Sequence, residues 1–399
     1  MMFVTRVEYQ PEYISRLPSY ISEIMITHPF KNIRLPALGL GMMRLPVVNG
    51  NDAEPDQKKV NEMVSYAMAH GLTYFDTGPG YHGKQCERVT AAALAPYPRS
   101  SYYLAVKFLG YDISDVNRVE EVFSRQLKTF HTDYFDFYLM QNVCESNIAY
   151  YLDEKYRIHS YLKSEKDAGR ITYLGFSAHG KIDVMEQFLE KYGADMDFCQ
   201  IQLNWLDYEF QDAKEKLALL EKYHLPVFVM EPLRGGKLAH LSPDAEKTLA
   251  AFRKQSSAAW ALQYLQSIPQ VAVVLSGMSD MAQLKENIAV MSEFAPASDE
   301  EKRALYAIAR EMTKGVPCTS CRYCVDHCPN ELDIPLLINT YNEYKFTNGG
   351  FVAPHFLASL AENKRPSACE ACGACEKACP QRIKISEVMA DFCTLAGYR

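Results

Sequence analysis

The sequence predicts an α/β protein: a (β/α)8 TIM barrel followed by a smaller, mainly α-helical domain rich in cysteine. Three observations lead to this fold class. Short apolar runs alternate with longer amphipathic segments eight times between residues 35 and 295. The 399-residue length exceeds one usual domain. Nine of the 12 cysteines follow residue 317. We therefore expect an extension of unknown role at residues 1–23, the barrel at 24–298 and the cysteine-rich domain at 299–399.

The eight strand candidates are short, apolar and separated by helical patterns such as QKKVNEMVSYAMAHG, whose Gly71 stands where a helix stop belongs. Eight parallel strands with helices outside form a closed barrel. The candidates are residues 37–41, 73–76, 102–107, 135–140, 171–177, 198–203, 226–230 and 271–275.

Composition and charge narrow the functional classes. The net charge is −7, and no long basic run is present that would follow a phosphate backbone, so we expect no nucleic-acid partner. No stretch of eighteen or more apolar residues occurs, and the first residues lack the order of a secretory signal. These features predict a cytoplasmic protein with no membrane partner.

The cysteine-rich domain carries one motif twice. Cys318, Cys321, Cys324 and Cys328 precede a proline, and the same CxxCxxCxxxCP spacing returns 51 positions later at Cys369, Cys372, Cys375 and Cys379. Three thiolates spaced by two residues let one tight turn wrap three corners of an iron–sulfur cube. Structural zinc sites are the alternative, but they usually present cysteines in pairs. The spacing therefore favours iron–sulfur ligation, with Cys393 as a small buried residue outside both runs.

This motif resembles that of the two-cluster bacterial ferredoxins, in which the last cysteine of each run ligates the cluster of the other run. The resemblance implies a ferredoxin-type domain with two [4Fe-4S] clusters and a role in electron transfer. One cluster would take Cys318, Cys321, Cys324 and Cys379, and the other would take Cys369, Cys372, Cys375 and Cys328.

Polar residues close the apolar runs of the predicted barrel, where barrel enzymes gather their chemistry. They are Asp76, Lys107, Gln141, Ser177, Gln200 with Asn204, and Glu231. An aspartate and a lysine at neighbouring strand ends could form a structural ion pair. Tyr81, in the loop after Asp76, favours a functional interpretation, because the two charged groups together can lower the pKa of a phenol.

Several of these segments resemble the aldo-keto reductases over about residues 24–295. The matching segments are FDTGPGY (75–81), AVKF (105–108), LGFSAHG (174–180), QIQLNW (200–205), VMEPLRGGKL (229–238) and LSGMSDMAQLKEN (275–287). The coupling of such a barrel to a two-cluster tail resembles a ferredoxin-tailed branch of the same family.

The resemblance implies an NAD(P)H-dependent oxidoreductase that transfers hydride from NADPH or NADH to a small carbonyl substrate. Tyr81 would give the proton, Lys107 and Asp76 would tune it, and Gln141 would orient the carbonyl. The residues implied for cofactor binding are Ser177, His179, Gln200, Met230, Pro232, Leu233, Arg234, Gly277, Gln283 and Asn287. For Arg234, contact with the diphosphate and solvation of its loop are equally favoured.

Two departures from the family pattern bear on this expectation. Gln141 stands where the family has a histidine, so an amide can still orient a carbonyl but cannot titrate near neutral pH. His82 could compensate, or it could be a packing residue. Met230 replaces the stacking tyrosine, and Gly277 and Gln283 replace the basic residues for a 2′-phosphate, so the sequence supports no preference for NADPH.

The clusters leave alternatives open. They could relay electrons between an electron-transfer protein partner and a substrate in the barrel, or they could hold the small domain together. The rival function is a nicotinamide-binding redox sensor with decayed catalysis, similar to potassium-channel β subunits. Reduction of an activated alkene is a further alternative. Whatever the function, we expect residues 330–360 to be helical, with a break at Gly349 and Gly350. We also expect the tail to pack on the barrel.

Overall fold

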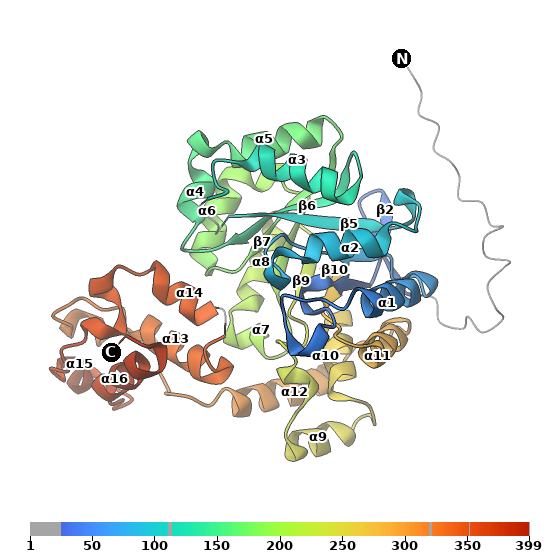
Figure 1. Cartoon of the computed structure of the whole chain (residues 1–399). Coiled ribbons are helices and arrows are strands. Elements are labelled where there is room, and N and C mark those ends of the chain that lie inside the picture. Colours follow the sequence, from blue (N-terminus) through green and yellow to red (C-terminus); the bar gives the residue numbers. More distant parts are fainter. Residues whose placement is uncertain (1–24, 111–113, 319–320, 351, 399) are drawn as a thin grey trace.

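The computed structural model describes residues 25–110, 114–318, 321–350 and 352–398, so the expected extension at residues 1–23 lies outside the described residues. Eight parallel strands close into a barrel in the order β10-β3-β4-β5-β6-β7-β8-β9, with helices on the outside (Figure 1). The predicted (β/α)8 architecture is confirmed. The strands are β3 (Leu38–Gly41), β4 (Tyr74–Asp76), β5 (Tyr103–Leu109), β6 (Phe135–Val143), β7 (Ile171–Ala178), β8 (Phe198–Gln202), β9 (Val227–Met230) and β10 (Val271–Ser276).

The barrel helices begin and end at the signals that the sequence carries. In the first, the Asp56 carboxylate caps the N-terminus by accepting from the Lys59 amide at 3.2 Å, and the chain turns away at Gly71 with φ +79°. The helices of this region are α1 (Gln57–Ala69), α2 (Cys86–Leu94), α3 (Val119–Phe130), α4 (Ile148–Leu152), α5 (Ile158–Asp167), α6 (Ile182–Tyr192), α7 (Asp207–Phe210), α8 (Ala213–Lys222), α9 (Pro243–Ala250), α10 (Ser257–Gln266) and α11 (Met281–Met291). Within the described ranges, no helix is both long and apolar enough to cross a membrane.

A β-hairpin that the sequence analysis did not identify covers the N-terminal end of the barrel. It consists of β1 (Thr27–Phe30) and β2 (Ile33–Pro36), paired antiparallel. The Phe30 ring contacts the rings of Phe137, Tyr173 and Phe228 inside the barrel, with centroids 5.6, 5.0 and 5.4 Å apart. The hairpin therefore closes the bottom of the barrel and leaves the opposite end, where the strands finish, for chemistry.

The interior of the barrel is filled by aromatic and branched side chains. Tyr74, Phe137, Phe198 and Phe228 are fully buried there, one from each of four strands. A second, larger apolar layer lies between the strands and the surrounding helices. Because such cores are close-packed, the strand ends are held in fixed positions relative to one another.

The C-terminal region is helical, as predicted, and packs against the barrel (Figure 1). Helix α12 (Asp299–Met312) begins next to the expected boundary at residue 298. Its residues Leu305, Ile308 and Ala309 belong to the barrel core, so the chain leaves the barrel only after this helix. Asn348 and the glycine pair after it separate two tail helices, which confirms the expected break. The helices are α12 (Asp299–Met312), α13 (Ile334–Thr347), α14 (Val352–Ser359), α15 (Ala374–Ala378) and α16 (Ile385–Ala396).

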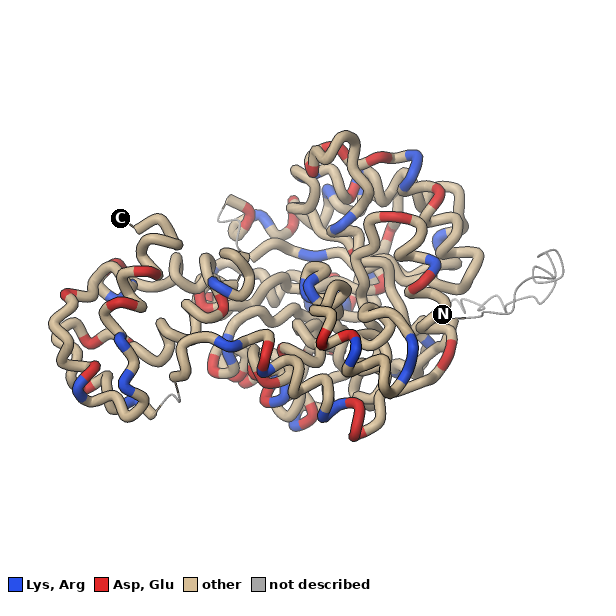
Figure 2. Tube along the Cα trace, turned by 90° about the horizontal axis from the view of Figure 1, so that it is seen from below, with Lys and Arg blue, Asp and Glu red and all other residues tan. Residues whose placement is uncertain are grey.

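Charged residues of both signs are interspersed along the trace of the barrel (Figure 2). Many of them are paired on the surface, for example Arg310 of α12 with Glu209 at 2.8 Å and Arg253 with Glu301 at 2.7 Å. Both pairs fasten α12 to the barrel. The connection between barrel and tail is therefore anchored before the cysteine-rich region begins.

Candidate active site and cluster sites

Four polar residues predicted to act together meet at the C-terminal ends of β4, β5 and β6. The Lys107 ammonium binds the Asp76 carboxylate and donates to the Thr77 carbonyl at 2.8 Å. It also lies over the Tyr81 ring, 5.6 Å from the centroid. The Gln141 amide nitrogen donates to the Tyr81 hydroxyl oxygen at 3.1 Å. The structure thus brings the sequence-predicted catalytic group together in one pocket.

Burial sets the protonation state of this group. The expected lowering of the Tyr81 pKa by Lys107 and Asp76 is wrong: burial, followed by the nearby Asp76 carboxylate, raises the pKa of Tyr81 above that of an ordinary tyrosine. Burial also raises the pKa of Asp76, an effect that Lys107 opposes. The Tyr81 phenol is therefore fully protonated at neutral pH and can donate, because Gln141 already donates to its oxygen and leaves its own O–H directed elsewhere.

Three buried oxygen atoms at the strand ends lack a hydrogen-bond partner among the described residues. They are Oδ2 of Asp76, Oε1 of Gln141 and Oε1 of Gln200. Buried acceptors of this kind are costly unless a ligand satisfies them. Ser177 is in register with Gln200, and its hydroxyl accepts from the Asn142 amide at 2.9 Å, which leaves its proton available. A carboxamide with its N–H donors and carbonyl oxygen fits this set.

The two histidines near the site are in different environments. His82 is buried beside Tyr81 in sequence, but its ring accepts from the Leu45 amide at 3.2 Å and lies 2.9 Å from the Asp52 carbonyl. It therefore fixes the loop after β3 and does not replace the missing family histidine. His179 follows β7, and desolvation lowers its pKa to about 3, so this imidazole is neutral at physiological pH.

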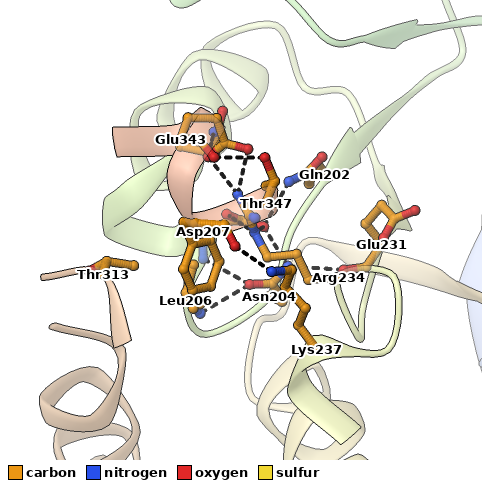
Figure 3. A network of polar contacts seen from close by, with 12 residues as sticks. Gln202, Asn204, Leu206, Asp207, Glu231, Arg234, Lys237, Thr313, Glu343 and Thr347 are labelled. Carbon is orange, nitrogen blue, oxygen red and sulfur yellow. Dashed lines mark hydrogen bonds and ion pairs between the residues drawn. The ribbon is translucent and has the colours of Figure 1, made fainter. Parts of the chain in front are cut away.

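The loop after β9 is held by a buried ion network (Figure 3). Arg234 is 6% exposed and donates to both oxygens of Asp207, at 2.8 and 3.0 Å, and to both oxygens of Glu343 in α13, at 3.1 and 2.9 Å. Asn204 donates to Asp207 at 2.6 Å and to the Glu231 carbonyl at 2.9 Å. Arg234 is thus neither solvated nor directed outward: it joins the loop to the tail.

The other residues expected around a nucleotide lie at the same end of the barrel, where β9 and β10 finish. Met230 ends β9 half-buried, and Pro232 and Leu233 follow it in the loop. Gln283 accepts from the Ser279 amide at 2.8 Å, and Asn287 is buried and donates to Ser276 at 3.0 Å. These last two side chains brace the loop and helix after β10, so any contact they make with a cofactor is additional to a structural role.

Arg44 is a rim residue that the sequence analysis missed. It follows β3, and its side chain passes next to Gly277 and Gly235: a Cβ atom placed on these glycines would lie 3.1 and 3.4 Å from it. Its guanidinium lies 3.6 Å from the Glu231 carboxylate, and half of the side chain is exposed. The structure therefore places a cation beside the glycine that replaces a basic residue of the family pattern. No local motif signals this proximity.

Three further residues, which the sequence analysis missed, hold Gln141 in position. The Tyr151 hydroxyl donates to the Gln141 carbonyl at 2.7 Å. Asn147 donates to the backbone carbonyl and the side-chain oxygen of Asn142, at 2.9 and 2.8 Å, and Asn142 itself has φ +50°. Because all three lie in or next to the loop after β6, only the folded loop brings them to the strand end.

The eight cysteines of the repeated motif surround two cavities. One, of about 300 Å³, is lined by Cys318, Cys321, Cys324 and Cys379. The other, of about 360 Å³, is lined by Cys328, Cys369, Cys372 and Cys375. Each cavity thus combines three cysteines of one run with the fourth of the other, which is the crossed arrangement expected from the sequence.

The two runs of cysteines, with four lining each cavity, favour a cube of four irons over a single ion. A zinc ion needs its thiolates about 2.3 Å from one centre. In the ranges that the structure describes, no three His, Cys, Asp or Glu side chains converge closely enough to hold one metal ion. Cys393 is buried on α16 and is absent from the lining of either cavity, as expected.

Comparisons with known families agree with both regions. The family model described as Aldo/keto reductase family matches residues 37–310, and the model described as 4Fe-4S dicluster domain matches residues 317–383. The first match ends inside α12, in agreement with the packing of that helix on the barrel.

The individual relatives share 25% or less of their aligned residues with this chain. L-galactose dehydrogenase of Arabidopsis thaliana is 25% identical over 65% of this chain and 86% of its own length. The uncharacterized oxidoreductase YqkF of Bacillus subtilis is 25% identical over 70% of this chain and 94% of its own. Among solved structures, an aldo-keto reductase from Bacillus halodurans in its holo form is similar with a TM-score of 0.58, 21% identity and coverage of 71% and 96% of the two chains. An aldo/keto reductase from Klebsiella pneumoniae, in complex with NADP and acetate, is similar with a TM-score of 0.57 and 18% identity. The match covers 72% of this chain and 96% of the other.

Proposed function

The chain belongs to the aldo/keto reductase family, and we propose that it is an NAD(P)H-dependent reductase in which Tyr81 protonates the oxygen of a small carbonyl substrate. The family membership makes the chain an oxidoreductase with a 4Fe-4S domain. The observation that carries the finer proposal is the contact between Gln141, Tyr81, Lys107 and Asp76 at the ends of three adjacent strands.

Each of these residues has a defined task. A reduced nicotinamide, when bound, would supply the hydride. Tyr81 holds a proton at its hydroxyl and donates it to the substrate oxygen as negative charge develops there. Lys107, over the ring, stabilises the phenolate that remains, and Asp76 fixes the Lys107 ammonium. Gln141 orients the Tyr81 hydroxyl without taking part in proton transfer, since an amide does not titrate.

The unpaired acceptors support the place of the nicotinamide. Gln200 offers a buried oxygen to a carboxamide N–H, and Ser177 next to it offers a hydroxyl proton to the carboxamide oxygen. Arg44 offers positive charge at the rim, next to Gly277, for the phosphates. Either NADPH or NADH is compatible with this set, because Arg44 adds a cation that the residues at positions 277 and 283 do not supply.

For the tail we propose two [4Fe-4S] clusters with crossed ligands, Cys318, Cys321, Cys324 and Cys379 for one and Cys369, Cys372, Cys375 and Cys328 for the other. We further propose that they supply folding energy to this domain. The thiol-bearing residues form part of its small apolar core, and a domain of this size gains much of its stability from such ligation.

Tyr81→Phe tests the proposed chemistry. The variant should lose about 10²- to 10⁴-fold in kcat, the usual contribution of a general acid, while nucleotide affinity stays unchanged. The assay is steady-state kinetics with a panel of small carbonyl compounds, run also in the oxidising direction with L-galactose because of the Arabidopsis relative. Tyr97→Phe, in the loop after α2 at the other end of the barrel, is the matched control and should leave kcat unchanged.

Two results would count against the proposal. Unchanged turnover in Tyr81→Phe would remove Tyr81 from the chemistry. Nucleotide binding without turnover of any substrate by the wild-type protein would favour a nicotinamide-binding sensor instead.

A further inference from the structure

A solvent-open cavity of about 1540 Å³ lies between the barrel and the tail. On the barrel side it is lined by the loops after β6, β7 and β8 and by the first turn of α8. On the tail side it is lined by Cys318 and by parts of α13 and α14. Tyr81, Lys107 and Gln141 are absent from its lining, and of the residues expected around the cofactor only His179 lies in it.

Lys216 of α8 is the unusual residue in this wall. It is only 6% exposed. Throughout the described ranges, its ammonium has neither a hydrogen-bond acceptor nor a carboxylate within ion-pair distance. Most of the Lys216 side chain is buried and only its end meets the open cavity, so its ammonium is poorly hydrated, and a lysine in this position without a counterion is seldom kept for stability. The free protein therefore holds a basic group that lacks a direct protein partner at the edge of a cavity.

The carboxylates around the cavity are already engaged or lie in water. Glu343 is paired with Arg234, as Figure 3 shows, and Glu209 is paired with Arg310. Glu145 accepts from the Lys181 backbone amide at 2.8 Å. Asp212 is exposed at the start of α8. None of the four provides Lys216 with a direct partner, so the counterion has to come from a ligand.

We propose that this cavity binds a small organic anion, whose carboxylate or phosphate oxygen accepts a hydrogen bond from the Lys216 ammonium. The ligand would lie between two landmarks of the cavity wall: His179, which follows the end of β7, and Cys318 of the cluster domain. Lys181 adds a second cation at the opening, where its ammonium lies over the Phe356 ring of α14 at 4.9 Å. The site therefore needs both domains to be complete.

The electrostatics of the wall agree with this assignment. Burial lowers the pKa of Lys216, and the surrounding carboxylates, of which Glu145 is the first, only partly compensate. The Lys216 charge in turn contributes to the low pKa of His179, after burial, so the two groups are neighbours. An anion bound to Lys216 would relieve both effects.

The test is calorimetric titration of the full-length, iron-replete protein without any nicotinamide, so its outcome is independent of the proposed reductase chemistry. Two pairs of probes separate the sources of the anion: FMN against riboflavin for a phosphate, and D-galacturonate against D-galactose for a carboxylate. We expect the charged member of at least one pair to bind at least about 10-fold more tightly than its neutral counterpart. Lys216→Met should abolish that difference, and Lys214→Met, an exposed lysine of the same helix, should preserve it.

A thermal melt distinguishes recognition from a structural role. Without ligand, Lys216→Met should unfold at a higher temperature than the wild type, because it removes an unpaired buried charge. Equal binding of charged and neutral probes, or wild-type anion binding by Lys216→Met, would overturn the proposal. So would the absence of saturable binding of FMN and galacturonate up to about 10 mM, or a lower melting temperature of Lys216→Met together with unchanged binding.

Discussion

The barrel and the tail organise their polar residues in opposite ways. In the barrel, Asp76, Lys107 and Gln141 sit on strands whose close-packed interior contains rings such as Phe137. Lys107 binds Asp76, and Gln141 donates to the Tyr81 hydroxyl. In the tail, eight cysteines of two distant segments surround two cavities in a small core. The comparison teaches that packing and hydrogen bonds within the protein hold the polar residues of the barrel in place, whereas the fold of the tail is proposed to depend on the clusters that fill its cavities.

The strongest test of this contrast removes clusters one at a time. If the ligands cross, Cys324→Ala, Cys379→Ala and the double variant should each retain about four of about eight iron atoms, because both cysteines serve one cluster. Pairing Cys379→Ala with Cys375→Ala should remove both clusters. Iron analysis of the purified proteins measures the result.

The same variants report on the two regions separately. The variant without clusters should lose the tail to limited proteolysis while the barrel remains resistant, since the barrel core does not include these cysteines. Cys393→Ala is the control, a buried cysteine of α16 in the same domain that lines neither cavity, and it should keep both clusters. Loss of both clusters in the Cys324→Ala/Cys379→Ala protein would contradict crossed ligation.

A smaller effect is expected where the two regions meet. Glu343→Gln removes one of the two carboxylates that bind Arg234 and leaves Asp207 in place, so it should cost about 1.5–3 kcal/mol of stability, the range for a hydrogen bond to a charged group. Chemical denaturation of the iron-replete protein measures this.

Glu209→Gln provides the matched comparison at the same interface. It breaks an exposed pair with Arg310 and should cost about 0–1 kcal/mol. Equal losses in the two variants would mean that burial does not distinguish these ion pairs, and that the Arg234 network is not what joins the loop after β9 to the tail.

The sequence predicts features that follow local patterns and misses contacts between distant residues. The eight strands follow from apolar alternation and the two cysteine runs from fixed spacing, whereas the crossing of the runs was implied by the resemblance to bacterial ferredoxins. The partners of Arg234, by contrast, lie 27 and 109 positions away, and Arg44 meets Gly277 only across the closed barrel. The hairpin that plugs the barrel was missed because its strands, THPF and IRLP, contain polar residues and prolines and form no apolar run. Contacts that depend on tertiary packing leave no periodic signal.

An effect that develops only as the pH rises concerns a buried carboxyl group in the barrel. Burial raises the pKa of Glu87 to about 7 from a usual 4.5, and its main partner is the Gln126 amide at 2.8 Å. Because the folded pKa is raised, the native protein binds the extra proton between these values. This contribution to stability is complete below pH 4.5 and is lost as the pH rises to about 7.

The wild-type protein should therefore lose on the order of 2–3 kcal/mol of unfolding free energy through this group over that interval. Glu87→Gln should flatten that part of the profile, whereas Glu286→Gln, an exposed glutamate of α11, should not. Denaturation at pH 5, 6, 7 and 8 is the measurement. Parallel profiles for wild type and Glu87→Gln would show that Glu87 titrates normally.

The most direct test of the central claim, that the strand ends of this barrel hold a nicotinamide cofactor, is an anaerobic titration. NADPH and then NADH are added to iron-replete protein while nicotinamide fluorescence and the visible absorption of the clusters are recorded together. We predict saturable binding of at least one nucleotide, with accompanying bleaching only if the clusters accept electrons through a mediator, because a hydride carries two electrons and a cubane cluster takes one. Failure of both nucleotides to bind would contradict the account.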